Sequence, residues 1–505
     1  MAFSLDIRGD KAHHLPLLVI IYIASHFPFV LSGFGEIDAT KIAVSVIDII
    51  NHGPHAAFAN YYFTDVVPLY IAYLKLCMKL VNYDYSYLPL VMNYTNAVAG
   101  TLTVIPAYLL IRRLWNNSII AFCTVFVLIF SPSYYQAGLM GFPHLISLFF
   151  LLVSLNFYLA AIDHIHKRTA YLFMVFSAVF LTVAFLFKSD IVLVSGIYIG
   201  LLFVRIVKDK DKIAGGLLII IISSLMFIVC RGMILGTTGG TTMSGEGLSK
   251  WYEYSISIPH TPRHFIRQAA PIVYGAGIVT SCLGSVLLVY FLLNKRLDIL
   301  AFIVSWAAVP TLFWLVLIGN NARHNMFSVL PLIAIIIVFF HEKLPRYTIV
   351  LSLFLVLANY FITAPSYSIL KPSGNLLQSN LLLEERMQMF RSRAREISSM
   401  PEKKIAVLGT FHNAHVVYDL MISSPSYEAV KIGREHYKML IGDREYMFFY
   451  FVVIKPEDIE KGASELTKEY NLSDYVFVSA SYDLQSLDAL GLKTKKIDII
   501  KRAEL

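Results

Sequence analysis

Several ionisable side chains have types and positions that could move a proton or bind a phosphate group. A carboxylate can take a proton from a hydroxyl, and a guanidinium forms paired hydrogen bonds to phosphate oxygens. A charge inside a membrane helix costs roughly 2.5–3.5 kcal/mol at the centre and less near the ends. The candidates all lie near the ends of apolar blocks or in the connections between them, and they are Asp38, Asp65, His144, Lys188, Asp190, Arg231, Arg323 and His324.

The apolar blocks predict an α-helical polytopic membrane protein. The chain is 57% hydrophobic and 15% charged, whereas soluble chains carry charge on about a quarter of their residues. Blocks long enough to cross a hydrocarbon core of about 30 Å must be helical, because lipid offers no partner to a free backbone group. About eleven spans are expected, at 15–33, 92–111, 118–135, 143–162, 169–187, 190–206, 213–230, 271–293, 299–318, 327–341 and 347–363.

Basic residues mark alternate connections, as the positive-inside rule requires. The N-terminus is therefore expected in the cytoplasm and the C-terminus outside, in the plasma (inner) membrane, or in the endoplasmic reticulum membrane if the source is eukaryotic. The net charge of +8 then reports topology, which argues against nucleic acid as a partner. The three long outer segments are 34–91, 231–270 and everything after 364, and most of the candidate residues fall on this face.

Composition divides the chain into three parts. Residues 1–363 form the transmembrane domain, 364–402 a juxtamembrane helical linker, and 403–505 a small domain. In the small domain short apolar strands alternate with helices, which predicts an α/β sheet with a largely parallel core. It has no GxGxxG motif, so nucleotide binding is not supported. All four cysteines lie in apolar stretches without ligand spacing, which argues against a zinc site or a disulfide framework.

The first outer segment contains two expected interfacial helices. In residues 37–52 one polar stripe lies opposite apolar positions, and Gly53 with Pro54 ends the helix. A second helix over 60–81 is expected to break near Pro68. The alternative to a role in a reaction is that both helices simply pack on the membrane surface. The polar stripe is formed by Asp38, Lys41, Ser45, Asp48 and His52.

The segment GEIDATKIAVSVIDIINHG resembles the opening of the C-type (GT-C) integral-membrane glycosyltransferases, especially the protein-mannosyltransferase and aminoarabinose-transferase branch. The resemblance implies that Asp38 is the catalytic base, with Glu36 as the neighbouring alternative. TDVVPLYIAYLKL is similar to the family's second loop motif and supplies Asp65. Here Val67 replaces the family's histidine, so no role that needs that histidine is carried over.

Three later segments also resemble family motifs. GFPHLISLFFLL contains His144, FLFKSDIVLV contains Lys188 and Asp190, and GNNARHNMFSVLP contains Arg323 and His324. The resemblance implies contacts to the substrate, with the last pair binding a lipid phosphate. Structural alternatives stay open: a histidine that caps its helix, a mutually neutralising Lys–Asp pair, and an arginine that snorkels to the interface.

Outer segment 231–270 begins at Arg231 and contains three aromatic residues, Trp251, Tyr252 and Tyr254. Their rings could stack on a sugar or form part of an interfacial aromatic belt. The resemblance implies that this region helps to close over donor and acceptor.

The resemblance implies transfer of a sugar from a polyprenyl-phosphate donor to an acceptor hydroxyl on a glycan, lipid or protein at the outer membrane face. One base and an in-line displacement predict inversion, with Asp38 as the base and Arg323 and His324 at the phosphate, helped by Lys188 or Arg231. No cofactor is required; two carboxylates in one loop could hold a divalent metal, but nothing in the sequence supports one. The rival functions are a transporter or flippase of a lipid-linked substrate, and a non-catalytic membrane scaffold.

Overall fold

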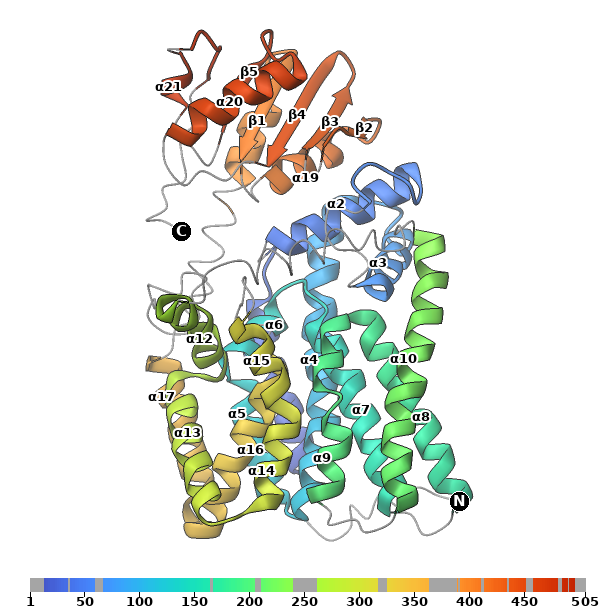
Figure 1. Cartoon of the computed structure of the whole chain (residues 1–505), viewed down its shortest axis with the longest axis vertical. Coiled ribbons are helices and arrows are strands. Elements are labelled where there is room, and N and C mark those ends of the chain that lie inside the picture. The colour runs from blue at the N-terminus through green and yellow to red at the C-terminus, as the bar shows by residue number, and fades with distance from the viewer. Residues whose placement is uncertain are drawn as a thin grey trace.

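A bundle of long helices carries a small α/β domain on one end (Figure 1). We call this end of the bundle the domain end. The structure is a computed structural model. It describes residues 13–34, 37–59, 67–163, 167–204, 210–238, 261–316, 325–362, 388, 391–409, 413–433, 436–450, 457–479, 484–488 and 490–495.

The bundle confirms a polytopic helical membrane protein. Within the described residues, seven helices are long and apolar enough to cross a membrane, or up to nine if each of two bent pairs is one span. The two remaining expected blocks contain the shorter helices α1, of 13 residues, and α9, of 8 residues. The helices of the bundle are α1 (His14–His26), α4 (Leu88–Trp115), α5 (Ser118–Ile129), α6 (Pro132–Leu139), α7 (His144–Asp163), α8 (Lys167–Phe187), α9 (Ile197–Val204), α10 (Lys210–Thr238), α12 (Pro262–Ala276), α13 (Ile278–Leu293), α14 (Leu297–Ile303), α15 (Val309–Val316), α16 (Met326–Lys343) and α17 (Thr348–Ile362).

Both bends have local causes. The axes of α5 and α6 differ by 61°, and Pro132 at the first turn of α6 cannot continue the preceding hydrogen-bond ladder. The axes of α12 and α13 differ by 100°. Gly277 joins them with φ +95°, and a Cβ there would lie 2.3 Å from the Asn359 side-chain oxygen. Only glycine fits this corner.

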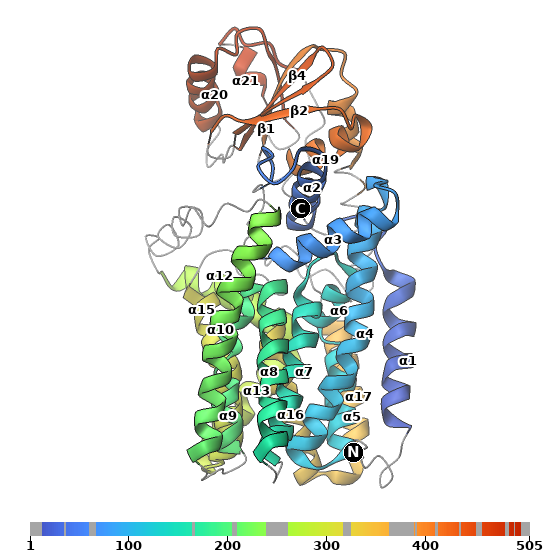
Figure 2. The same ribbon diagram turned by 90° about the vertical axis from the view of Figure 1, so that its right-hand side faces the viewer.

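Two shorter helices lie across the domain end, between the bundle and the α/β domain (Figure 2). The first, α2 (Ile37–His52), has the predicted bounds. The second, α3, runs from Pro68 to Leu80. It begins at the proline where the sequence predicts a break, because proline is favoured in the first turn of a helix. The rest of the expected second helix, residues 60–66, lies outside the described part of the chain.

The α/β domain contains a five-stranded sheet of order β2-β3-β4-β1-β5. The expected parallel core is present, because β1 pairs in parallel with both β4 and β5. The antiparallel β2–β3–β4 part was not expected, and its turn at Gly442 takes φ +60°. The elements are β1 (Lys404–Gly409), α19 (Asn413–Ser423), β2 (Glu428–Lys431), β3 (His436–Ile441), β4 (Arg444–Tyr450), α20 (Glu457–Tyr470), β5 (Val476–Val478) and α21 (Gln485–Asp488).

The central strand β1 is buried on both faces of the sheet. Alternate residues of β1 point to opposite sides, as strand geometry requires. Ala406 and Leu408 join a core that is closed by α20. Ile405 and Val407 join the core that continues through α19 into α2 and the helix bundle. The domain is therefore packed onto the bundle through a continuous apolar interior.

Candidate functional site

Asp38 lies in the first turn of α2, where the partial positive charge of a helix N-terminus favours a carboxylate. Its side chain is partly buried. Burial raises the pKa of the Asp38 carboxyl, and the charges of Lys41 and Lys188 act in the opposite direction. The carboxyl therefore has both properties of a general base at moderate pH: a raised proton affinity and cations that favour its ionised form.

Lys188 follows directly after α8 and is only 2% exposed. Its backbone N–H donates to the Ala184 carbonyl at 3.0 Å, which extends the last turn of the helix. Its ammonium nitrogen lies 5.5 Å from the centroid of the Phe142 ring, within the range of a cation–π contact. A buried ammonium is costly without partners, and Asp38 and Phe142 provide partners for it.

Hydrogen bonds between helices bring the surrounding residues to one level of the bundle. The Ser147 hydroxyl donates to the Ala184 carbonyl at 2.8 Å and joins the start of α7 to the end of α8. The side-chain amide of Asn96 on α4 donates to the carbonyls of Met140 and Phe142, just before α7. The turn that leads into α7 is therefore fixed against both neighbouring helices.

His144 is the first residue of α7 and is fully buried. Its ring stacks on Phe142 with centroids 4.8 Å apart and lies 5.9 Å from the ring of Phe327. Phe327 is the second residue of α16, and the buried Asn325 directly precedes that helix. A row of rings therefore runs from Lys188 to the start of α16.

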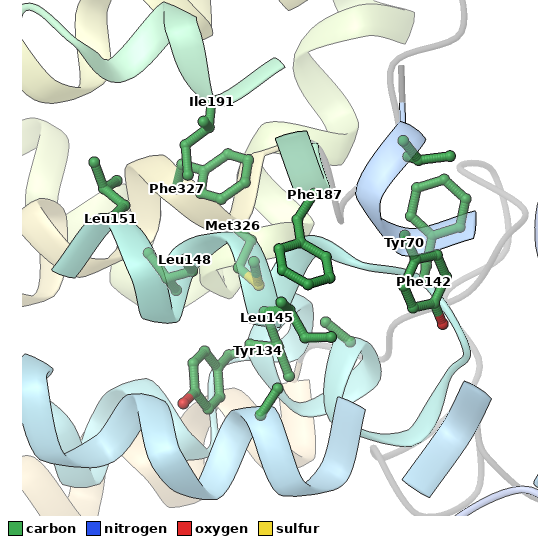
Figure 3. Close-up of a cluster of buried hydrophobic side chains, with 14 of the residues drawn as sticks. Tyr70, Tyr134, Phe142, Leu145, Leu148, Leu151, Phe187, Ile191, Met326 and Phe327 are labelled. Carbon is green, nitrogen blue, oxygen red and sulfur yellow. The ribbon is translucent and has the colours of Figure 1, made fainter. Parts of the chain in front are cut away.

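Apolar side chains from several helices pack together around these rings (Figure 3). Phe187 comes from the end of α8 and Ile191 from the turn η4 (Ser189–Val194), and both are buried. This packing keeps the surroundings of Lys188 and His144 poor in water, which strengthens electrostatic interactions among the buried groups. The cluster also includes Leu145, Leu148, Leu151 and Met326.

The structure thus brings together three of the sequence-predicted residues: Asp38 and Lys188 through their charges, and His144 through Phe142. Asp190 lies in η4, two positions after Lys188. Arg231 lies on α10, with its guanidinium carbon 5.8 Å from the Phe227 ring of the same helix. That contact does not link it to Asp38. Asp65, Arg323, His324 and the alternative base Glu36 lie outside the described residues.

Three residues around Asp38, Lys188 and His144 were not predicted as site residues. Lys41 stands one helical turn after Asp38, and the polar stripe already placed it on the same face. Phe142 and Asn325 lie inside segments that drew attention for His144 and Arg323. Both lie within two residues of a predicted site residue at a predicted helix start, which is a usable signal. Their burial, in contrast, depends on the tertiary packing.

No group of three or more His, Cys, Asp or Glu side chains that could hold a metal ion occurs within the described ranges. A cleft of about 870 Å³ opens between the bundle and the α/β domain. Its lining includes Asn51, Tyr83 and Ser423. Asn51 is close to the C-terminal end of α2, about 20 Å along the helix from Asp38 at 1.5 Å per residue. This cleft is therefore separate from the Asp38 cluster.

Neither a known family's sequence model nor a curated protein sequence matches the chain. Solved structures do. The apo oligosaccharyltransferase of Archaeoglobus fulgidus is similar with a TM-score of 0.53 and 13% identity, over 83% of this chain and 64% of that one. The chain thus spans less than two thirds of that enzyme's length. ArnT of Cupriavidus metallidurans bound to undecaprenyl phosphate is similar with a TM-score of 0.51 and 13% identity, over 82% of this chain and 76% of that one.

These similarities show the fold. The chain has the fold of the C-type integral-membrane glycosyltransferases, and the fold implied by the sequence resemblance is confirmed.

Proposed function

We propose that this protein is a glycosyltransferase that moves a sugar from a polyprenyl-phosphate donor to an acceptor hydroxyl at the extracytoplasmic face of the membrane. The observation that carries the proposal is that the Asp38 carboxyl lies within electrostatic range of the buried Lys188, at the domain end of the bundle. The fold shared with an oligosaccharyltransferase and with ArnT supports glycosyl transfer. The undecaprenyl phosphate bound to ArnT supports a lipid phosphate as the leaving group.

Asp38 is proposed to act as the general base. An acceptor hydroxyl is a weak nucleophile until its proton is removed, and a positioned base contributes about 10²–10⁴-fold to such a step. The base takes the hydroxyl proton as the acceptor oxygen attacks the anomeric carbon. The bond from that carbon to the phosphate oxygen breaks on the opposite side, so the product has inverted configuration.

The leaving phosphate needs positive charge where its negative charge develops. Lys188 lies in the cluster and can supply one such charge. Arg323 and His324 directly precede Asn325 and α16, whose start lies next to His144. We assign the phosphate contact to this pair, because a guanidinium forms two parallel hydrogen bonds to phosphate oxygens. Asp65, Asp190 and Arg231 are proposed to complete the sites for sugar and acceptor.

The membrane orientation follows from the positive-inside rule, which places the N-terminus in the cytoplasm and the α/β domain outside. The proposed partners are the lipid bilayer, the lipid-linked donor, and a glycan, lipid or protein acceptor. The residues and donor chemistry proposed for this reaction need no cofactor.

Purified protein in lipid nanodiscs, incubated with a panel of polyprenyl-phosphate sugars and candidate acceptors, tests the proposal. The proposal predicts acceptor-dependent release of free polyprenyl phosphate and a glycosidic product inverted relative to the donor. A parallel assay in sealed vesicles follows movement of intact donor across the bilayer. Transbilayer movement of the donor without release of polyprenyl phosphate would instead identify a flippase. If the protein shows neither activity with any donor, the remaining interpretation is a non-catalytic scaffold.

A further inference from the structure

The α/β domain holds α2, the helix that carries the proposed base. Figures 1 and 2 show α19 directly over α2. Side chains of α19 such as Val417 and Leu420 belong to the same apolar core as Ile42 and Val46 of α2. The helix is thereby buried on the side that faces the domain as well as on the side that faces the bundle.

Asp48 is the polar centre of this contact, and its side chain is 0% exposed. One carboxylate oxygen accepts a hydrogen bond from the Tyr427 hydroxyl at 2.7 Å and lies 2.9 Å from His52 Nδ1. The other accepts the Phe58 backbone N–H at 2.6 Å. Since a buried carboxylate is costly without hydrogen bonds, Tyr427 from the α/β domain helps to satisfy a charge that lies on α2.

Further contacts extend this arrangement, and we call Asp48, Asn51, Tyr85 and Tyr427 the Asp48 network. The Tyr85 hydroxyl donates to the Asn51 side-chain oxygen at 2.6 Å. Asn51 also lies close enough to the Tyr427 hydroxyl to influence its pKa. Burial and the neighbouring Asp48 raise the pKa of the Tyr427 hydroxyl, so it stays protonated and remains a donor. The network therefore joins the C-terminal end of α2 to both the domain and the bundle.

A second contact lies near the other end of α2. The Thr40 hydroxyl is 3.4 Å from His415 Nδ1 of α19, and Thr40 is two positions after Asp38. The domain therefore touches α2 at Thr40, near the base, and through Tyr427 at Asp48, further along the helix. Contacts at two separated points fix the tilt and rotation of a rigid helix, whereas one contact would leave it free to pivot.

We propose that the α/β domain is a positioning element for the reaction, which holds α2 through the Asp48 network and so fixes the Asp38 carboxylate against the acceptor hydroxyl. This inference rests on the proposed function of Asp38. Tyr427 and Asp48 are positioning residues, because they act through the helix and not on the substrate. Misplacement of a reacting group by about 1 Å can cost about a hundredfold in rate, so loss of the network should lower turnover.

Tyr427→Phe removes the hydrogen bond to Asp48 with little change in side-chain volume. Tyr475→Phe is the matched control, because the Tyr475 hydroxyl also donates to a carboxylate, that of Glu445, within the α/β domain and away from α2. We expect kcat to fall about ten- to hundredfold in Tyr427→Phe, with the donor KM unchanged and the acidic limb of the kcat–pH profile shifted. Tyr475→Phe should retain wild-type values. Equal kcat in the two variants, or a changed donor KM alone, would overturn the inference.

Asp48→Asn and the double variant complete a cycle that distinguishes positioning from a general loss of folding. If Tyr427 acts through Asp48, the loss in the double variant will be clearly smaller than the product of the two single losses. Losses that multiply would instead show that Tyr427 does not act through Asp48, and would overturn the inference.

Hydrogen–deuterium exchange on the full-length variants gives a readout that does not depend on catalysis. Tyr427→Phe should raise exchange in residues 37–52 and leave the long bundle helices unchanged. Unchanged exchange in 37–52 would contradict the positioning role, even if the wild-type protein transfers sugar. Raised exchange in a protein that transfers no sugar would instead contradict the proposed function and leave the structural role of the domain intact.

Discussion

Lys188 lies close enough to Asp38 for its charge to lower the pKa of a carboxyl that burial raises. The two residues are far apart in the sequence, one at the end of α8 and the other at the start of α2. Each supplies what the other needs: a counter-charge for a buried ammonium and a cation that favours the ionised base. Their interaction places a carboxylate and a cation at the same end of the bundle.

Lys188→Met tests this pairing by removing the charge and keeping most of the side-chain volume. A general base acts only when ionised, so activity falls as the pH drops through its pKa. Loss of the lysine raises the pKa of Asp38 further, and the acidic limb of the kcat–pH profile should move to higher pH. Lys431→Met, at an exposed position on β2, is the control. If the acidic limb stays at the wild-type pH, Lys188 does not influence the pKa of the base.

Asp38→Asn should lose little stability near pH 7.5, because two effects oppose each other. Lys188 loses a counter-charge but keeps its contact with Phe142, and a carboxylate that burial disfavours is removed. The folded-state pKa of Asp38 is raised above the ordinary value of 3.8, so the folded protein binds this proton more readily than the unfolded chain. Stability therefore falls as the pH rises from the unfolded to the folded pKa, and a neutral amide avoids that loss. Thermal unfolding at pH 7.5 checks this. A large drop in Tm would show that the charge of Asp38 is structurally required.

Two substitutions at His144 test whether its imidazole contacts the substrate or only packs between neighbouring rings. His144→Phe keeps a ring between Phe142 and Phe327 and should preserve Tm, whereas His144→Ala opens a cavity and should cost about 2–4 kcal/mol. If the imidazole contacts the substrate, His144→Phe will lower kcat/KM for the donor by about tenfold. Wild-type kinetics in His144→Phe would leave it a packing residue.

Gly100→Ala should destabilise the bundle without a specific effect on chemistry. A Cβ at Gly100 would lie 1.8 Å from the Tyr22 hydroxyl oxygen. Tyr22 cannot move away easily, because it stacks on His26 at 3.8 Å and meets the edge of Tyr134. We expect a loss of about 1–3 kcal/mol, measured by thermal unfolding in detergent. Gly232→Ala on α10, where a Cβ meets nothing within 4 Å, is the control and should be neutral or stabilising. Equal changes in Tm for the two variants would contradict the close packing at Gly100.

Local patterns in the sequence were sufficient to predict much of the fold. The bounds of α2 follow from its amphipathic period and from Gly53 and Pro54, and long apolar runs predicted the spans. The β2–β3–β4 arrangement was missed, although the turn dipeptide Gly442-Asp443 between two runs rich in apolar and aromatic residues carries a hairpin signal. The missed strands follow α19, so the alternation of helices and strands favoured a parallel interpretation of the domain.

Partners distant in the sequence could not be predicted. Asp48 belongs to the expected polar stripe, but its contact with Tyr427 joins two domains and leaves no periodic signal in the chain. The proximity of Lys188 to Asp38 likewise depends on how α8 and α2 meet. The sequence could propose the residue types of the site, whereas their pairing required the packed helices.

The most direct test of Asp38 as the base measures donor binding and single-turnover transfer in the same Asp38→Asn preparation. Asp443→Asn, on an exposed turn of the α/β domain, is the matched control for loss of a carboxylate. We predict an unchanged donor Kd and a transfer rate lowered by about 10²–10⁴-fold, with both values normal in Asp443→Asn. Wild-type transfer by Asp38→Asn would contradict the mechanism.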